Sequence, residues 1–148
     1  MRRADSADAP DTLLQTLAAF RFEMRRFLHF SESAALEAGL QPQQHQLLLQ
    51  VAGAPAATAV TIAFAAERLG LKHNSTVELV DRSVREGLLT RTVDPSDKRR
   101  AILKVTRQGY RILARLSAGH ARELNVLAPR LIHALQNIRL HHRAAEIQ

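Results

Sequence analysis

Hydrophobic residues recur every three or four positions over most of the chain, which is the spacing of an α-helix with one buried face. From Asp11 to about Ser33 this pattern predicts an amphipathic helix, and Pro42 is placed as the first-turn proline of a second helix. Thr106 is placed to cap a long helical region, along which an apolar seam follows with the same spacing, and Pro129 interrupts it. Because proline removes a helical hydrogen bond, the seam predicts either two helices or one kinked helix.

Between these flanking helices, residues 61–87 predict two short helices joined by a tight connector. Thr61 is placed to cap the first helix and Gly70 to end it, and Gly87 is placed to end the second. Ser75 and Glu78 have the spacing of a capping box, so we expect the second helix to begin at Ser75. Two short helices with such a connector predict a helix-turn-helix.

The second of these helices is predicted to have a packing face and an outward face. Val77, Val80 and Val84 share the predicted packing face, and the residues predicted to lie elsewhere are Thr76, Leu79, Arg82, Ser83 and Glu86. A helix that opens with small polar side chains is suited to enter the major groove of DNA. We therefore expect DNA contacts from this helix and from its entry, at Lys72, His73, Asn74, Ser75, Thr76 and Arg82.

After the second helix the pattern becomes typical of a β-hairpin. Residues 88–93 and 101–106 predict the two strands, and residues 94–100 predict the loop between them. Basic residues at such a tip can reach phosphates or the minor groove, and the alternative is a solvated turn that keeps the edge strands soluble. The neighbouring helix-turn-helix favours DNA contacts by the three basic residues of the loop, Lys98, Arg99 and Arg100.

The distribution of charge supports the same assignment. The 148 residues carry a formal net charge of +7. Between Lys72 and Arg115 there are eleven basic residues and five acidic ones, an excess of six. A positive excess concentrated on one module indicates a polyanionic partner.

In its order and spacing, the segment resembles the DNA-binding half of the MarR family of transcriptional regulators. The resemblance is carried by AERLGL, a helix containing LVDR, EGLLTR, DPSDKRRA, and KVT followed by Gly109. It covers nearly the whole chain apart from about the first ten residues, although Phe64 and the apolar stretch 53–60 depart from the family pattern. The resemblance implies that Asp97 braces the wing of the fold and that Arg99 reaches the minor groove.

The resemblance also implies the organisation of the chain and its partners. The expected fold is mainly α with a small β-hairpin wing, divided into a flexible N-terminus (1–10), an N-terminal dimerisation helix (11–38), a winged helix-turn-helix (39–106) and C-terminal dimerisation helices (107–148). A twofold dimer would bind a pseudo-palindromic site in double-stranded DNA. Regulators of this family commonly respond to small, often aromatic anions. Arg25, His29 and His45 can supply polar groups for such an effector, the alternative being that they pack or face water.

Several classes of chemistry are not indicated by the sequence. It has no cysteine, which excludes disulfides and thiolate metal sites, and it has no nucleophile elbow, phosphate loop or HExxH motif. No two of the seven histidines are spaced four residues apart, so we expect no metal site, no cofactor and no enzyme activity. The chain lacks a membrane-spanning run and the apolar core of a signal peptide, so we expect a cytoplasmic location.

These observations favour a homodimeric, sequence-specific DNA-binding regulator. One alternative is an architectural protein that coats DNA regardless of its sequence and loses affinity with salt to the same extent on every duplex. Another is a protein-interaction adaptor with a winged helix that has lost DNA binding, which the basic excess and the intact Asp97-to-Arg100 segment disfavour.

Overall fold

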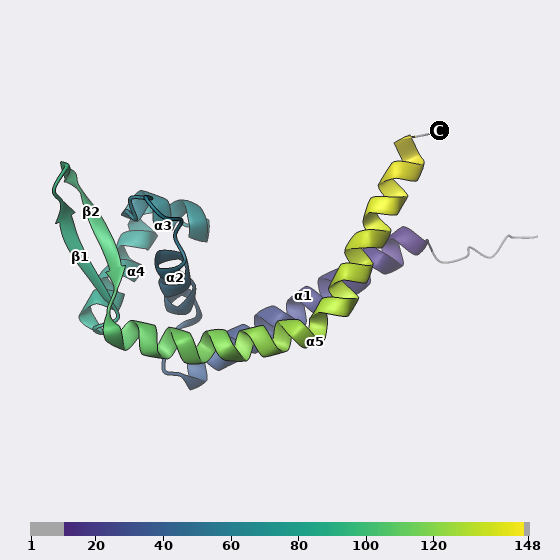
Figure 1. Ribbon diagram of the computed structural model, residues 1–148, viewed down its shortest axis with the longest axis horizontal. Coiled ribbons are helices and arrows are strands. Elements are labelled where there is room, and N and C mark those ends of the chain that lie inside the picture. The colour runs from purple at the N-terminus through teal and green to yellow at the C-terminus, as the bar shows by residue number, and fades with distance from the viewer. Residues whose placement is uncertain (1–10, 147–148) are drawn as a thin grey trace, which may run out of the picture. The chain divides into compact units, whose positions relative to one another are not determined.

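A computed structural model describes residues 11–146. The predicted N-terminal segment 1–10 therefore lies outside the described residues. The elements follow in the order α1 (Thr12–Glu37), α2 (Pro42–Ala52), α3 (Ile62–Leu69), α4 (His73–Arg85), β1 (Leu89–Asp94), β2 (Asp97–Val105) and α5 (Arg107–Glu146) (Figure 1). The antiparallel pair β1–β2 stands beside the short helices, and this mainly helical fold with one hairpin is the predicted fold class.

The chain forms two compact units. Unit 1 contains the described parts of two segments, residues 11–30 and 121–146, whereas unit 2 is Ser31–His120. Helices α1 and α5 each contribute to both units. Unit 2 extends beyond the predicted winged-helix domain (39–106) because Ala35 of α1 and Leu113 and Leu116 of α5 pack into its core.

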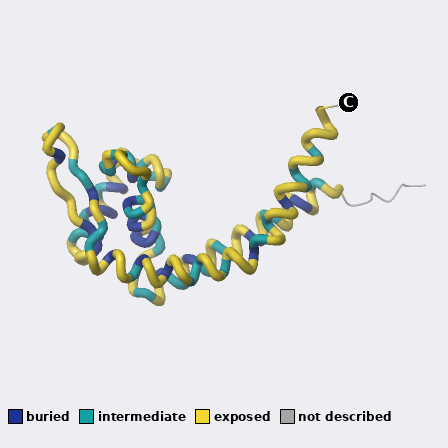
Figure 2. The backbone as a smooth tube through the Cα atoms, viewed as in Figure 1, coloured by how far each residue is buried: buried dark blue, intermediate teal, exposed yellow. Residues whose placement is uncertain are grey.

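The core of unit 2 is built from one buried face of every element in it. Figure 2 shows the buried positions gathered where the short helices and the hairpin meet. The aliphatic side chains at its centre come from all three short helices and both strands: Leu47, Leu48, Val51, Ile62, Ala65, Leu79, Val80, Leu89 and Leu103. The stretch 53–61 forms no strand of its own, yet the Leu103 amide donates to the Val60 carbonyl at 2.8 Å and fixes this loop against β2.

The predicted helix ends are confirmed on both sides of α3 and at the start of α5. The Thr61 hydroxyl accepts the Phe64 amide at 3.2 Å, and Gly70 ends α3 in the left-handed conformation. The Thr106 hydroxyl accepts the Gly109 amide at 3.1 Å and donates to the Gly87 carbonyl at 2.6 Å. This one hydroxyl therefore connects the start of α5 to Gly87, just after the end of α4.

The prediction that α4 begins at Ser75 is wrong. The helix begins at His73, with Lys72 as its N-cap. The Lys72 carbonyl accepts both the amide and the hydroxyl of Thr76, at 3.0 and 2.9 Å, so helical hydrogen bonding starts one turn before Thr76. The capping-box spacing at Ser75 was misleading because these backbone bonds absorb the connector into the first turn.

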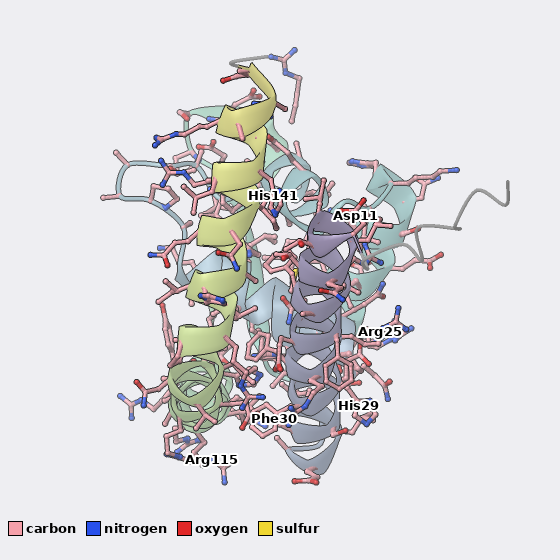
Figure 3. All side chains as sticks on the ribbon, turned by 90° about the vertical axis from the view of Figure 1, so that its right-hand side faces the viewer. Asp11, Arg25, His29, Phe30, Arg115 and His141 are labelled. Carbon is pink, nitrogen blue, oxygen red and sulfur yellow. The ribbon has the colours of Figure 1, made fainter. Side chains whose placement is uncertain are left out.

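Helix α5 is a single helix rather than two, and Pro129 lies inside it. In unit 1, α1 and α5 run side by side (Figure 3), and Arg130 donates to Glu23 at 3.0 Å across the pair. Neighbouring turns keep their hydrogen bonds on each side of the proline, so the missing amide does not end the helix. No helix among the described residues is long and apolar enough to cross a membrane.

Candidate nucleic-acid interface

The first turn of α4 presents four consecutive exposed polar residues, Lys72, His73, Asn74 and Ser75. The amides of a first helical turn lack intrahelical acceptors, and the helix dipole places partial positive charge at the same end. Lys72 adds a full positive charge there. This end of α4 therefore suits a phosphate or an electronegative base edge.

Thr76, which the sequence assigned to the DNA contacts, does not lie on this surface. It is fully buried, and its hydroxyl is used by the Lys72 carbonyl. The packing face of α4 is formed by Thr76, Leu79, Val80 and Ser83, while Val77 and Val84 are only partly buried. The predicted valine face was therefore rotated from the real one, because small polar residues that bond to their own helix can be buried as readily as valine. Arg82 is exposed, as predicted.

The second strand of the wing is longer than predicted, the first is shifted by one residue at the predicted length, and the tip between them is shorter. The turn consists of Pro95 and Ser96 alone, so the three basic residues lie in β2 rather than in a loop. Val93 pairs with Ala101 and Asp94 pairs with Asp97, so residues 98–100 are extra residues on β2 opposite a single step of β1. Such a bulge redirects side chains and increases twist, and here all the redirected residues are cationic.

Asp94 fixes the conformation of this bulge, a role that the sequence did not reveal. Its carboxylate accepts the Ser96 amide at 2.9 Å, the Ser96 hydroxyl at 2.8 Å and the Arg100 guanidinium at 2.6 Å. The Ser96 amide, then the Ser96 hydroxyl, then Arg100 lower the pKa of Asp94 to about 2. The side chain of Asp94 is 7% exposed, whereas that of Arg100 remains 45% exposed. The Asp–Pro dipeptide predicted a turn, and it gave no sign of the partner six residues away.

Asp97 holds Arg99 in the manner expected of a wing brace. Its carboxylate accepts the Arg99 amide at 3.1 Å and the Arg99 Nε at 3.2 Å. These bonds, the side-chain one first, lower the pKa of Asp97 from its ordinary value. The Arg99 side chain is 92% exposed. Its guanidinium is thus held at one end and open to solvent elsewhere, which leaves donors available to DNA.

An ion pair joins the wing to α4. Arg91 of β1 donates to Asp81 of α4 at 2.8 Å, and both side chains are partly exposed. The two residues are ten positions apart in sequence, and the reversal of the chain between α4 and β1 brings them together. It restricts how the wing can move relative to α4 within unit 2.

The three residues considered for an effector lie in different surroundings. Arg25 and His29 are exposed on one side of α1 in unit 1, and Figure 3 shows both side chains pointing outward. His45 lies on α2 in unit 2 and is 2% exposed, with its ring centroid 4.9 Å from that of His120. These positions match the alternative reading, in which the first two face water and the third packs. No group of three His, Cys, Asp or Glu residues among residues 11–146 is arranged to hold a metal ion.

Comparisons with known proteins agree with this geometry. A family model described as "MarR family" matches residues 38–100. The MarR family transcription regulator SP03579 is 20% identical and has the same fold, with a TM-score of 0.73 and coverage of 93% of this chain and 91% of that chain. The sequence matches no curated protein.

Two regulators with solved structures are somewhat more similar in sequence. The PcaV transcriptional regulator from Streptomyces coelicolor is 28% identical, with 84% of this chain and 96% of that chain covered and a TM-score of 0.58. The transcriptional repressor CouR, bound to a 23-mer DNA duplex, is 26% identical, with coverage of 88% and 90% and a TM-score of 0.64. CouR from Rhodococcus jostii RHA1, bound to p-coumaroyl-CoA, is 25% identical, with coverage of 76% and 83% and a TM-score of 0.59. The fold is therefore that of the MarR family transcription regulators.

Proposed function

We propose that this chain, whose winged-helix domain belongs to the MarR family, is a homodimeric regulator that binds specific sites in double-stranded DNA. The first turn of α4 reads base edges in the major groove, and the wing contacts the backbone or the minor groove beside it. The contacting residues are Lys72, His73, Asn74, Ser75, Arg82, Lys98, Arg99 and Arg100. Thr76 is left out because it is buried.

The observation that carries this proposal is the fixed presentation of cations beside an exposed helix start. Asp94 and Asp97 hold Arg100 and Arg99 at the bulge, and both guanidinium groups keep exposed surface. The pair of Arg91 with Asp81 ties this wing to α4. A solvated turn would need neither the two braces nor the tie, whereas a DNA-binding wing gains affinity when its cations are pre-organised.

Homodimerisation is supported by the apolar surface of unit 1. Of the fourteen large hydrophobic residues that are exposed in the described part of the chain, ten lie in residues 11–30 and 121–146. Among them are Val126 at 60% exposure, Ile132 at 54% and Leu140 at 62%. Exposed apolar surface of this extent marks an interface, and a twofold axis would present two α4 helices to one palindrome.

A small-molecule effector is also part of the proposal. It is supported by the solved complex of CouR with p-coumaroyl-CoA, a ligand of that protein. For this chain an anionic or aromatic ligand is the corresponding expectation. Arg25 and His29 are exposed and can contact such a ligand, whereas His45 is buried beside His120 and would need its neighbours to move first.

The deciding experiment is selection of bound duplexes from a random pool at near-physiological salt, followed by sequencing. A site-specific dimer should enrich a palindrome whose half-sites are about one helical turn, roughly 34 Å, apart. The Arg99→Ala variant should enrich the same sequence with weaker retention. Binding without enrichment, with an equal salt dependence on every duplex, would instead establish the architectural alternative and refute the base contacts of α4.

A further inference from the structure

Two histidines that the DNA interface does not use lie against each other inside unit 2. His45 of α2 is 2% exposed, and its ring centroid is 4.9 Å from that of His120 of α5, with the ring planes tilted by 34°. Imidazole is the side chain whose ordinary titration falls near neutral pH. Two such rings at this distance cannot both become charged without repelling each other in a poorly hydrated site.

The hydrogen bonds of His120 define its neutral state. Its Nδ1 donates to the Leu116 carbonyl, which can only accept, so Nδ1 carries the proton. Its Nε2 lies 2.6 Å from the Ser31 hydroxyl, which donates to that nitrogen while His120 is neutral. Proton uptake by His120 turns Nε2 into a donor, and the Ser31 hydroxyl must then rotate to accept. His120 can therefore take a proton without losing a partner.

His45 has no comparable way to accommodate a proton. Its Nδ1 lies 3.4 Å from the Gln46 side-chain amide nitrogen, which is a donor and would oppose a protonated Nδ1. Burial first, and the charge of His120 second, lower the pKa of His45. Helix α2 has no acidic residue that could compensate a positive charge on His45. Ser31, which faces the pair from α1, is also uncharged. Gln44, the residue before His45, already engages the nearby Glu86 carboxylate at 2.8 Å.

The cluster formed by His45, His120 and Ser31 lies where the chain passes from one unit to the other. The chain passes between the two units twice, in α1 after Phe30 and in α5 after His120. Ser31 and His120 are the residues of unit 2 at these two crossings, and they are hydrogen-bonded to each other. This bond therefore joins the two helices at the points where they leave unit 2.

We propose that His45, His120 and Ser31 form a proton-sensitive switch at the two crossings, which weakens DNA binding when the pH falls below neutral. This inference rests on the proposed DNA-binding function. While His45 is neutral, its ring packs against that of His120 with the centroids 4.9 Å apart. Acidification disfavours this contact, because a proton taken up by His45 would be buried beside a second imidazole ring.

The sign of the stability effect follows from the direction of the shift. The pKa of His45 is lowered in the folded chain, so the unfolded chain binds the proton more readily. The stability associated with neutral His45 is fully present above its ordinary pKa of about 6.5 and is lost as the pH falls from that value toward the folded one. DNA affinity should fall in the same window if DNA requires this packing.

The test combines two measurements on the full chain at constant ionic strength. The first follows the imidazole C2 protons of His45 and His120 by NMR from pH 8 to pH 5. The second measures, at pH 7.5 and 5.5, the affinity for a duplex enriched from the random pool. Wild type is compared with His45→Gln, with His120→Gln as a second variant in case the first does not fold. His133→Gln removes an exposed histidine of α5 as the matched control.

Coupled titration, with His45 below its ordinary value, is expected. Between pH 7.5 and 5.5, the DNA affinity of wild type and of His133→Gln should fall by up to about tenfold for each unit by which the pKa of His45 differs between DNA-bound and free protein. His45→Gln should lose much of this pH dependence. His73 at the DNA face is present in all of these variants, so its contribution is the same in each comparison.

Two outcomes would overturn the inference. One is independent titration of both rings at ordinary values, and the other is an unchanged pH dependence of affinity in both folded variants of the pair. If wild type binds no duplex even at pH 7.5, the proposed function fails, and with it the effect on DNA. The NMR titration then still decides whether the two rings share their protons.

Discussion

Units 1 and 2 treat their hydrophobic residues in opposite ways. In unit 2, fourteen buried residues form one continuous core, and its buried hydroxyls at Thr76 and Ser83 bond to backbone carbonyls. In unit 1, Leu127 and Ala134 are the hydrophobic residues that are buried, while ten large ones are exposed. Unit 2 therefore buries its own hydrophobic core, and its exposed residues are not needed to form that core. Unit 1 leaves most of its large hydrophobic residues exposed, which is the surface expected of the proposed dimer interface.

The largest effect is expected where unit 1 is made unable to pair. Ile132→Asp places a charge on its exposed apolar surface and should abolish the dimer while unit 2 stays folded. DNA affinity should then fall by about 100-fold or more, because the second half-site no longer binds in an intramolecular step. Analytical ultracentrifugation and a DNA titration measure both effects. Leu36→Asp, at an equally exposed leucine of unit 2, is the matched control, and a dimer that survives Ile132→Asp would contradict the comparison.

The interior of unit 2 should be sensitive to a single added methyl group. A Cβ at Gly109 would lie 2.5 Å from the Leu88 carbonyl oxygen and 2.7 Å from Val105 Cγ1. Gly109→Ala should therefore destabilise the fold by about 1–3 kcal/mol, because backbone must shift to make room. Urea denaturation measures this, with Gln108→Ala at the exposed neighbour as control. An unchanged midpoint would mean that α5 can move away from β1 at little cost.

The wing of unit 2 should contribute affinity without contributing to the fold. Arg99→Ala removes a side chain that is 92% exposed, so stability and dimerisation should be unchanged. DNA affinity should fall by about tenfold, and the slope of log affinity against log salt should decrease by about one if the contact is to a phosphate. Arg143→Ala, in the last turn of α5, is the control. Equal affinities of Arg99→Ala and wild type would refute the role of the wing.

Two adjacent residues of α4 should have different roles, Ser75 in DNA sequence preference and Thr76 in the stability of the fold. Ser75→Ala should change the preferred DNA sequence and leave stability unchanged, because Ser75 is exposed. Thr76→Ala should cost about 1 kcal/mol of stability through the lost hydrogen bond and keep the sequence preference. Selection from a random pool and urea denaturation of both variants test this. The reverse pattern would place Thr76 in the interface after all.

The smallest effect is expected for the brace at Asp94, in acid. Its folded pKa of about 2 lies below the ordinary value, so its contribution to stability is present above about pH 4 and is lost as the pH falls toward 2. Asp94→Asn should flatten this part of the stability profile and weaken DNA binding slightly by loosening Arg100. Denaturation of both proteins between pH 2 and 5 measures the effect. Parallel profiles would show that the carboxylate is not a brace.

The sequence alone determined the order of the elements and the ends of several of them. Thr61, Gly70, Gly87 and Thr106 act through local backbone geometry, so their effect is written in a few neighbouring residues. The basic excess between Lys72 and Arg115 is likewise a property of composition. Local rules therefore sufficed for the helix-turn-helix and the hairpin, and the charge count supports the proposal of a polyanionic partner.

Tertiary structure decided which side chains point outward and which distant residues meet. Thr76 was misassigned because the face of α4 that packs is set by its neighbours α2, α3 and β1 and not by the valines in its own sequence. The Asp94 brace, the tie of Asp81 with Arg91 and the pair of His45 with His120 join residues 6, 10 and 75 positions apart. No local pattern encodes such pairs, because each depends on how the chain returns on itself. These contacts depend on how the elements of unit 2 pack together, and not on the helical spacing of residues along the chain.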